Sequence, residues 1–525
     1  MQSRPAWWSA PARRPRLTAA IAAVIVLALA VRAIDPLPVG AMYDDGLYVI
    51  LAKSLATGHG YRWLNLPGAP PATHFPPGYP AVLSLLWRAF PAFPANVLAF
   101  KALNAVLLAI AAASLVLFAH RRLRLEPAAA AVVAIVGCAA IPTLVLSTVV
   151  MSETLFLAVF CVVLPVADRM VEAPRRAWEP LLLGVLVAAL TMVRTHGIAL
   201  AVAIVIALAM CRRWREVGMF VAAFVLCMAP WQLWQTVHRG AVPVAMRGSY
   251  ESYGGWLAHG FGAAGAALAG RTLARTGMEL FANVVVMAGA GLPMVARAIA
   301  AFGALLLVGL GMARLRRLSV VTFLFLGAYL AIVLLWPFAP SRFVWGIWPL
   351  LTMVVALGIA GVWRWRPNVA PLRAARVAGG VIVATVLCGY ATYTIRGYRG
   401  RWWSSIPRQA GAIARPLVRW TIQHTRPDDV VASNAEPLVY LYTGRPSVPV
   451  ASLSIDEYFA PPSVAARVGV LRSILHAYPV DAVVVMANDS VSAAARTLAS
   501  GPAPELVLRD SIPNGIVFAR SPTFR

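Results

Sequence analysis

The stretch VLAFKALNAVLLAIAAASLVLFA, residues 97–119, carries a single charged residue, Lys101. A helix needs roughly 17–25 apolar residues to cross the hydrocarbon of a bilayer, so this stretch is long enough to span a membrane. Similar runs recur along the chain, which is 60% hydrophobic and only 13% charged. Soluble domains carry about 25% charged residues. The composition therefore predicts an α-helical polytopic membrane protein.

The apolar runs predict about 11 transmembrane helices. They cover residues 17–34, 97–119, 128–147, 152–167, 180–193, 197–210, 217–235, 293–312, 320–336, 344–362 and 374–393. Between 180 and 210 we predict two helices rather than one, because Arg194 and His196 interrupt the run. Ionisable groups are costly in the middle of a bilayer.

Basic residues outnumber acidic ones by 46 to 20, which gives a formal charge of +26. They cluster in short segments between apolar runs, at 120–124, 175–176, 212–215, 314–317 and 364–366. The positive-inside rule places such segments in the cytoplasm. We therefore expect a multi-pass protein of a bacterial-type plasma (inner) membrane, with a cytoplasmic N-terminus and everything after residue 393 outside.

The same distribution bears on partners and on the N-terminus. The sequence has no basic stripe with interleaved aromatics, so we expect no nucleic acid as a partner and instead membrane lipids with anionic headgroups.

Basic residues from Arg4 onward precede the first apolar run, a pattern shared with cleavable signal peptides. An uncleaved first helix fits better, because the chain stays hydrophobic for hundreds of residues.

The C-terminal part of the chain has a different pattern. Short runs rich in Val, Tyr and Leu predict strands at 429–432, 438–442, 482–486 and 506–508, with helices at 463–478 and 490–500. Strands that alternate with helices indicate a small α/β domain. We therefore divide the chain into a transmembrane domain, 1–393, and a soluble extracytoplasmic α/β domain, 394–525.

The first outer loop, residues 35–96, contains the most informative segment. It reads MYDDGLY at 42–48, LAKSLATGHGY at 51–61 and THFPPGYP at 73–80. Two adjacent carboxylates, Asp44 and Asp45, open a predicted short amphipathic helix, where the helix dipole favours negative charge. Helix capping alone would also account for such a pair.

This loop resembles the signature of the GT-C glycosyltransferases, in the branch of the protein mannosyltransferases and the lipid A aminoarabinose transferase (family 39-like). An acidic motif, an amphipathic helix, a Gly-His-Gly-Tyr-like turn and a Pro-Pro motif occur in this order between Tyr43 and Pro80. The many spans and the outer C-terminal domain also match. The resemblance is strong over roughly the first two hundred residues and looser afterwards.

The resemblance implies transfer of a sugar from a polyprenyl-phosphate-linked donor to an envelope acceptor, which could be a glycan, a lipid or a protein. Transfer would take place on the outer face of the membrane, with inversion. Attack on the anomeric carbon needs a carboxylate to accept the proton of the acceptor. We assign this role to Asp44 or Asp45 and favour Asp44. The phosphate leaving group needs fixed cations, for which Arg342 and Arg194 are the candidates.

Four further residues are candidates for the site. Glu153 begins a helix at the outer surface and could be a second catalytic acid. His74 precedes the Pro-Pro motif and could bind substrate. Together these two residues could hold a divalent metal ion, which we leave open. Tyr43 and Lys53, within the acidic loop, are candidate substrate ligands.

Two other classes of function would leave different features in the sequence. A transporter or flippase of polyprenyl lipids or small molecules would carry ionisable groups in mid-bilayer and often internal repeats. Here the charges lie at the predicted outer interface and no repeat is found. A scaffold whose outer domain binds partners is the third class. Neither a P-loop nor a dinucleotide-binding glycine pattern is present, which argues against direct use of a nucleotide.

Overall fold

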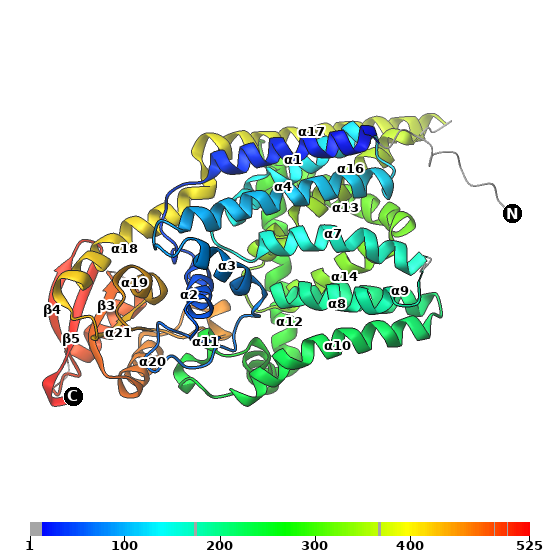
Figure 1. Cartoon of the computed structure of the whole chain (residues 1–525). Helices are drawn as coiled ribbons and strands as arrows, with labels where there is room; N and C mark the ends of the chain where they lie inside the picture. The colour runs from blue at the N-terminus through cyan, green and yellow to red at the C-terminus, as the bar shows by residue number, and fades with distance from the viewer. Residues whose placement is uncertain (1–12, 173–175, 366–368, 488, 501, 525) are drawn as a thin grey trace.

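The computed structural model describes residues 13–172, 176–365, 369–487, 489–500 and 502–524. Three residues of the predicted basic segments, Arg4, Arg175 and Arg366, lie outside these ranges. Long helices run side by side in a bundle, and a small domain with a β-sheet lies at one end of it (Figure 1).

Six helices of the described chain are long and apolar enough to cross a membrane. They are α1 (Arg13–Ala33), α4 (Val97–Arg121), α7 (Glu153–Glu172), α10 (Trp214–Val237), α13 (Met294–Leu318) and α17 (Ala370–Gly400). Four shorter apolar helices are α8 (Glu179–Val193), α9 (Ile198–Met210), α14 (Val320–Leu335) and α16 (Trp348–Arg364). The helices α5 (Pro127–Cys138) and α6 (Ile141–Thr148) form a pair bent by 57°. Every predicted run corresponds to one of these helices or to the bent pair, while the exact number of spans stays a prediction.

The chain reverses between α8 and α9, as the interruption at Arg194 predicts. Glu179, at the start of α8, pairs with Arg169 near the end of α7 at 3.1 Å. Arg213, just after α9, donates to the backbone carbonyl of Glu172 at 2.8 Å. Because α8 begins and α9 finishes beside the same end of α7, the two helices form a hairpin. The turn, with Arg194 in it, lies at the other end of the bundle.

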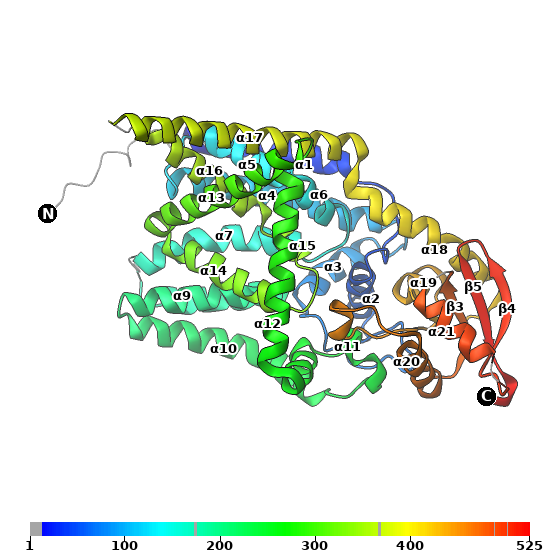
Figure 2. The same ribbon diagram turned by 180° about the vertical axis from the view of Figure 1, so that it is seen from behind.

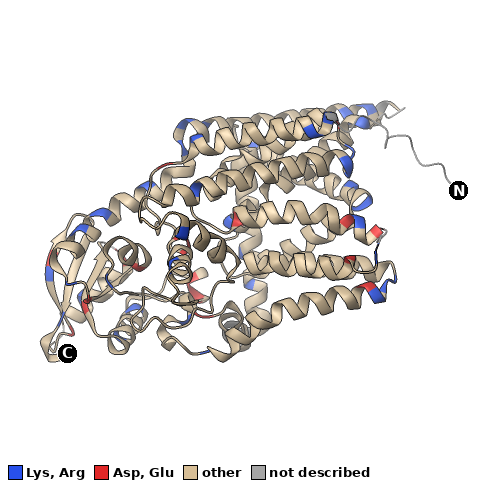
Figure 3. Ribbon diagram, viewed as in Figure 1, with Lys and Arg blue, Asp and Glu red and all other residues tan. Residues whose placement is uncertain are grey.

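Charged residues gather at the ends of the bundle. Lys and Arg are concentrated at the end away from the C-terminal domain (Figure 3). Some of them are tied to acids there: Arg122 contacts Asp168 at 3.3 Å, and Ser319 donates to the same carboxylate at 2.6 Å. The predicted basic segments thus lie together at one end of the bundle, and the placement of this end in the cytoplasm stays a prediction.

The first outer loop folds between the bundle and the C-terminal domain (Figure 1). It contains the predicted acidic helix, α2 (Asp44–Ala56), and a second helix, α3 (Gly78–Ala89), in a segment predicted to be loop. The predicted outer loop 236–292 is also largely helical. Its helix α12 (Tyr253–Ala288) runs across the bundle instead of along it (Figure 2). The short α11 (Arg247–Tyr250) precedes it, and α15 (Ser341–Trp345) joins α14 to α16.

The C-terminal domain begins with α18 (Ser405–His424) and has a five-stranded sheet in the order β2-β1-β3-β5-β4. Its elements are β1 (Val430–Ser433), α19 (Glu436–Thr443), β2 (Ser447–Pro449), α20 (Val464–Ala477), β3 (Val480–Met486), α21 (Ser490–Ala499), β4 (Leu506–Ile512) and β5 (Gly515–Arg520). Strands β2, β1 and β3 are parallel, whereas β5 and β4 are antiparallel to their neighbours. The predicted α/β domain is confirmed.

One predicted strand of this domain is wrong. Residues 438–442 belong to α19, because Pro437 fits the first turn of a helix and Gly444 ends it in the left-handed conformation, with φ of 76°. The apolar residues that suggested a strand are buried on several sides of this short helix. Strands β2 and β5 were not predicted.

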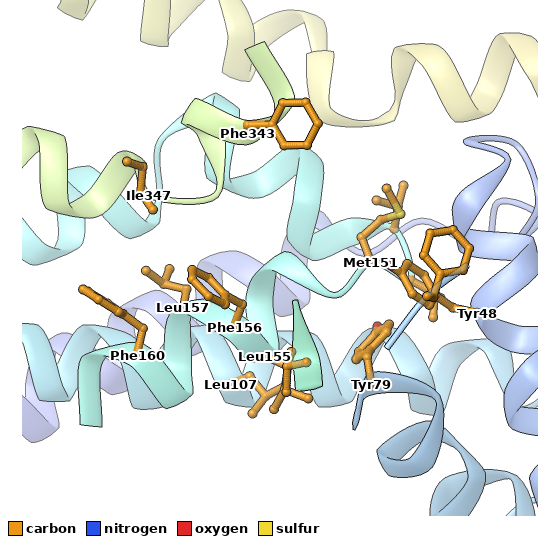
Figure 4. Packing of buried hydrophobic residues seen from close by; sticks show 14 of the residues in the cluster. Tyr48, Tyr79, Leu107, Met151, Leu155, Phe156, Leu157, Phe160, Phe343 and Ile347 are labelled. Atoms are coloured by element: carbon orange, nitrogen blue, oxygen red, sulfur yellow. The ribbon is translucent and has the colours of Figure 1, made fainter. Parts of the chain in front are cut away.

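Apolar packing fixes the acidic loop against the bundle. Tyr48 of α2 and Tyr79 of α3 meet edge to face with ring centroids 5.2 Å apart, close to Met151 (Figure 4). Phe156 and Phe160 continue this buried cluster along α7. The Tyr48 hydroxyl also lies 3.1 Å from Ser152 Oγ. The start of α2 is therefore held beside the start of α7, where Glu153 lies.

Candidate active site

A cavity of about 490 Å³ lies between the bundle and the C-terminal domain. One wall comes from the first outer loop, the turn between α8 and α9, and α15. The opposite wall comes from the segments that follow β1 and β2. Of the residues predicted to form the site, those on the cavity wall are Tyr43, Asp44, His74, Arg194 and Arg342.

A chain of ion pairs lies in the wall formed by the first outer loop, the α8–α9 turn and α15, which we call the membrane-side wall. Arg342 Nη1 binds Asp44 Oδ2 at 2.6 Å, and its Nε binds Glu153 Oε1 at 2.7 Å. Arg194 Nη1 reaches the same Glu153 oxygen at 3.0 Å and Ser152 Oγ at 3.1 Å. Two carboxylates thus alternate with two guanidinium groups. Glu153 is 2% exposed, and such buried charges require partners of this kind.

The four residues come from four separate elements. Asp44 opens α2, Glu153 opens α7, Arg342 lies in α15, and Arg194 lies in the α8–α9 turn. The Arg194 guanidinium also lies 5.4 Å above the ring of Phe343. Burial by itself lowers the pKa of Arg342, but the nearby Glu153 and Asp44 carboxylates raise it well above its usual value. Arg342 therefore keeps its positive charge in the site.

The two adjacent aspartates have different surroundings. Asp44 faces the cavity, whereas Asp45 is 1% exposed and accepts a hydrogen bond from the backbone N–H of Met42 at 3.0 Å. Burial raises the pKa of Asp45 to about 6, against the opposing effect of nearby backbone N–H groups. Asp45 therefore stabilises the turn before α2, and Asp44 is the carboxylate that a substrate could reach.

Glu436 of the C-terminal domain joins the site and was not predicted. Its Oε1 accepts hydrogen bonds from the hydroxyls of Tyr43 at 2.5 Å and Tyr250 at 2.9 Å. Burial raises the pKa of Glu436 to about 7. Glu436 follows β1 closely, and the carboxyl ends of parallel strands are common ligand sites. That position is the signal in the sequence that could have identified it.

Of the predicted substrate ligands His74 and Lys53, His74 lies on the cavity wall and Lys53 lies outside it. His74 lies on the cavity wall, where its ring packs on Tyr253 with centroids 4.1 Å apart. Burial lowers the pKa of His74 below its usual value, so the ring is neutral. Lys53 lies outside the cavity wall and donates to the hydroxyl of Tyr440 at 3.2 Å.

The candidate metal ligands do not form a metal site. Glu153 is bound by two guanidinium groups, and Nδ1 of His74 contacts the backbone carbonyl of Glu251. Within the described ranges, no three His, Cys, Asp or Glu side chains are grouped to hold an ion. Arg342 and Arg194 supply the positive charge of the site. The residues present therefore do not fit a divalent metal.

Aromatic side chains and one histidine complete the membrane-side wall. Tyr253, Trp256 and Trp336 line the cavity next to the bundle. His196 lies in the α8–α9 turn, 5% exposed, with its ring 5.0 Å from that of Phe343. Neither ring nitrogen of His196 has a hydrogen-bond partner among the described residues.

Comparison with known proteins gives matches in structure only. No protein-family model and no curated protein matches the chain. The structure of ArnT from Cupriavidus metallidurans bound to undecaprenyl phosphate covers 97% of this chain and 98% of its own, with 13% identity and a TM-score of 0.54. An oligosaccharyltransferase from Archaeoglobus fulgidus, in complex with Zn and sulfate, covers 89% of this chain and 68% of its own, with 14% identity and a TM-score of 0.50. The chain has the fold of these structures, so the predicted architecture, a helical polytopic membrane protein with a small C-terminal α/β domain, is confirmed.

Proposed function

We propose that this chain, which has the GT-C fold, is a glycosyltransferase that moves a sugar from a polyprenyl-phosphate carrier to an acceptor outside the membrane. The observation that carries the proposal is a carboxylate, Asp44, held 2.6 Å from Arg342 in a cavity between membrane helices and an outer domain. A base beside a fixed cation is what transfer from a lipid phosphate requires.

The reaction follows from these two groups. An acceptor hydroxyl attacks the anomeric carbon and gives its proton to Asp44. The bond between that carbon and the phosphate oxygen breaks, and the lipid phosphate leaves with the electron pair. Attack from the face opposite the phosphate inverts the configuration. Arg342 and Arg194 stabilise the charge that develops on the leaving phosphate.

Donor binding changes the partners of Arg342 in this scheme. With no donor bound, the Arg342 guanidinium bridges Asp44 and Glu153. A phosphate that binds Arg342 competes for the same N–H groups and leaves Asp44 free to accept a proton. The similar ArnT structure contains undecaprenyl phosphate, a lipid of the class that we propose here.

The experiment compares envelope glycans by mass spectrometry in cells that carry wild type, Asp44→Asn or Asp45→Asn. Removal of a catalytic base typically costs about 10²–10⁴-fold in rate. We expect Asp44→Asn to abolish the glycan product and Asp45→Asn to retain most of it. A parallel assay with purified protein and radiolabelled polyprenyl-phosphate sugar separates transfer to an acceptor from movement of the lipid across the membrane. Unchanged glycans in the Asp44→Asn strain would contradict the proposal.

A further inference from the structure

The cavity has a second wall that the proposed reaction does not use. The parallel strands β1 and β2 both end at it: β1 ends at Ser433 and β2 at Pro449, and the cavity wall continues with Asn434 and Glu436 and with residues 450–453. In open α/β sheets, ligands bind beyond the carboxyl ends of parallel strands. The C-terminal domain thus presents its ligand-binding edge to the same cavity that holds Asp44.

Two charged side chains on this wall, one buried and one partly exposed, each have a buried atom without a hydrogen-bond partner among the described residues. Glu436 is 1% exposed, and its Oε2 has no partner among the described residues. Arg467 of α20 binds both oxygens of Glu457, at 3.1 and 2.9 Å, and its Nε has no partner within the same ranges. A buried polar atom without a partner is costly. A bound molecule would supply the missing partners.

The charges of this wall suit hydroxyl groups better than a phosphate. Arg467 is neutralised by Glu457, so it does not offer a free cation. Glu436 offers a carboxylate oxygen, which accepts from hydroxyl donors and repels anions. Arg342 and Arg194, across the cavity, are paired with Asp44 and Glu153, but in the proposed reaction a donor phosphate displaces Asp44 from Arg342. The two walls therefore differ in the chemistry that they recognise.

The sheet disfavours a peptide that binds as an added strand. An extended peptide binds a sheet by pairing with an exposed edge strand. The edge strand nearest the cavity is β2, and Asn65 of the first outer loop already occupies it. The backbone N–H of Ser447 donates to Asn65 O at 2.6 Å, and Asn65 Nδ2 donates to Ser447 O at 3.3 Å. A peptide cannot extend the sheet at this point.

We propose that this wall is the acceptor subsite, in which Glu436 and the Glu457–Arg467 pair bind the hydroxyl groups of a sugar. The inference rests on the proposed function. Tyr43, which donates to Glu436, directly precedes Asp44 in the chain. A sugar held by Glu436 therefore lies next to the base, with a hydroxyl that can attack the donor. The attacking oxygen forms the new glycosidic bond, and Asp44 takes its proton.

The first test separates the two walls with matched variants. The acceptor-wall variants are Glu436→Gln, which keeps the side-chain shape, and Arg467→Ala. The control is Arg472→Ala on the same helix, whose ion pair with Glu505 lies outside the cavity wall. We measure the affinity of each protein in nanodiscs for undecaprenyl phosphate, and the glycan product in cells that carry each variant.

We expect both acceptor-wall variants to lose about tenfold or more of the product, the effect of losing a hydrogen bond to a charged group. Their affinity for undecaprenyl phosphate stays within about a factor of two, because the membrane-side wall, with Arg342, is unchanged. The control variant Arg472→Ala retains both the glycan product and the affinity for undecaprenyl phosphate. Unchanged product in Glu436→Gln and Arg467→Ala, or an equal loss of lipid binding, would overturn the acceptor subsite. If Asp44→Asn also leaves the product unchanged, the proposed function itself fails.

The second test identifies the class of acceptor. A photo-crosslinking benzoylphenylalanine replaces Ser452, which lies on the acceptor wall after β2. The same probe at Leu508, which is 60% exposed on β4, is the control. We expect a glycan adduct, sensitive to periodate, at position 452 alone. A protein adduct at 452, or no adduct above the control, contradicts a sugar acceptor.

Discussion

Asp44 and Asp45 are adjacent in the sequence, but only one of them faces the cavity. The sequence predicted the pair as candidate bases and favoured Asp44, but it could not say which of the two side chains faces a substrate. Successive residues on a helix point about 100° apart. The rotation of α2 about its axis therefore decides which carboxylate lines the cavity. That rotation depends on contacts with Ser152, just before α7, and with Glu436 of α19, which are remote in sequence.

Arg342 is expected to be irreplaceable even by another cation. Its Nε and Nη1 bind two different carboxylates, and a lysine ammonium lacks this planar fork. We predict that Arg342→Lys and Arg342→Met each lower transfer by about 10²–10³-fold, the usual effect of removing one preorganised donor. Arg342→Met also weakens binding of undecaprenyl phosphate.

The control for Arg342 is Arg316→Met, which removes an exposed charge at the other end of the bundle. Lipid binding is measured in nanodiscs and transfer with labelled donor. Wild-type transfer by Arg342→Lys would show that the site needs only a positive charge there. That result would contradict the bridging role.

Glu436 makes the stability of the protein depend on pH. Burial raises its pKa to about 7 in the folded state, above the usual 4.5. A carboxyl group with a raised pKa binds its proton more tightly when folded, so it stabilises the fold at low pH. This contribution is lost as the pH rises through about 7. We predict that the melting temperature of wild type falls between pH 5 and pH 8, and that Glu436→Gln reduces this fall.

The measurement is thermal unfolding of the purified protein in one detergent across that pH range. The Tyr43→Phe variant removes one of the two hydroxyls that donate to Glu436, so it shifts the transition to higher pH. A melting temperature of Glu436→Gln that follows the wild-type curve at every pH would rule out Glu436 as the titrating group.

At the scale of elements, the close contact of α2 with α19 joins the two parts of the site. A Cβ atom on Gly46 would lie 2.7 Å from Pro437 Cβ and 2.9 Å from Gly40 Cα. No flexible side chain could move away from either contact. Glycine at position 46 therefore allows the start of α2 to reach Glu436 of α19.

Gly46→Ala is expected to destabilise the protein by about 1–3 kcal/mol, the typical cost of overpacking. The matched variant is Gly218→Ala in α10, where a Cβ atom meets nothing within 4 Å. That change stabilises an ordinary helix by up to about 1 kcal/mol. Melting temperatures of the two proteins should therefore move in opposite directions. Equal shifts would mean that α2 and α19 do not depend on this contact.

The helices of the bundle could be predicted from the sequence because hydrocarbon requires long apolar runs. The elements that complete the site could not. The segment 438–442 has apolar and aromatic residues that suit either a strand or a buried helix, and tertiary packing decides between them. Helix α12 contains Arg271, Arg275 and several glycines, so it does not reach the hydropathy of a span. Glu436 is an isolated acid, distinguished only by the strand that precedes it.

At the scale of the whole molecule, the two ends of the bundle differ in charge and in function. Lys and Arg gather at one end, and the cavity and the C-terminal domain lie at the other (Figure 3). In the proposed reaction, the polyprenyl-linked sugar reaches this cavity from the outer leaflet, and the acceptor enters from the side of the C-terminal domain. The sequence predicted this division through its loop charges.

Cysteine labelling tests that orientation, because the C-terminal domain contains no cysteine. Cys211 is exposed just after α9, at the basic end, and Leu508 is exposed on β4. We predict that a membrane-impermeant maleimide labels Leu508→Cys in intact cells but reaches Cys211 only after lysis. The positive-inside rule gives the reason, since basic segments remain in the cytoplasm. Labelling of Cys211 in intact cells, with Leu508→Cys protected until lysis, would place the cavity in the cytoplasm and exclude an extracytoplasmic acceptor.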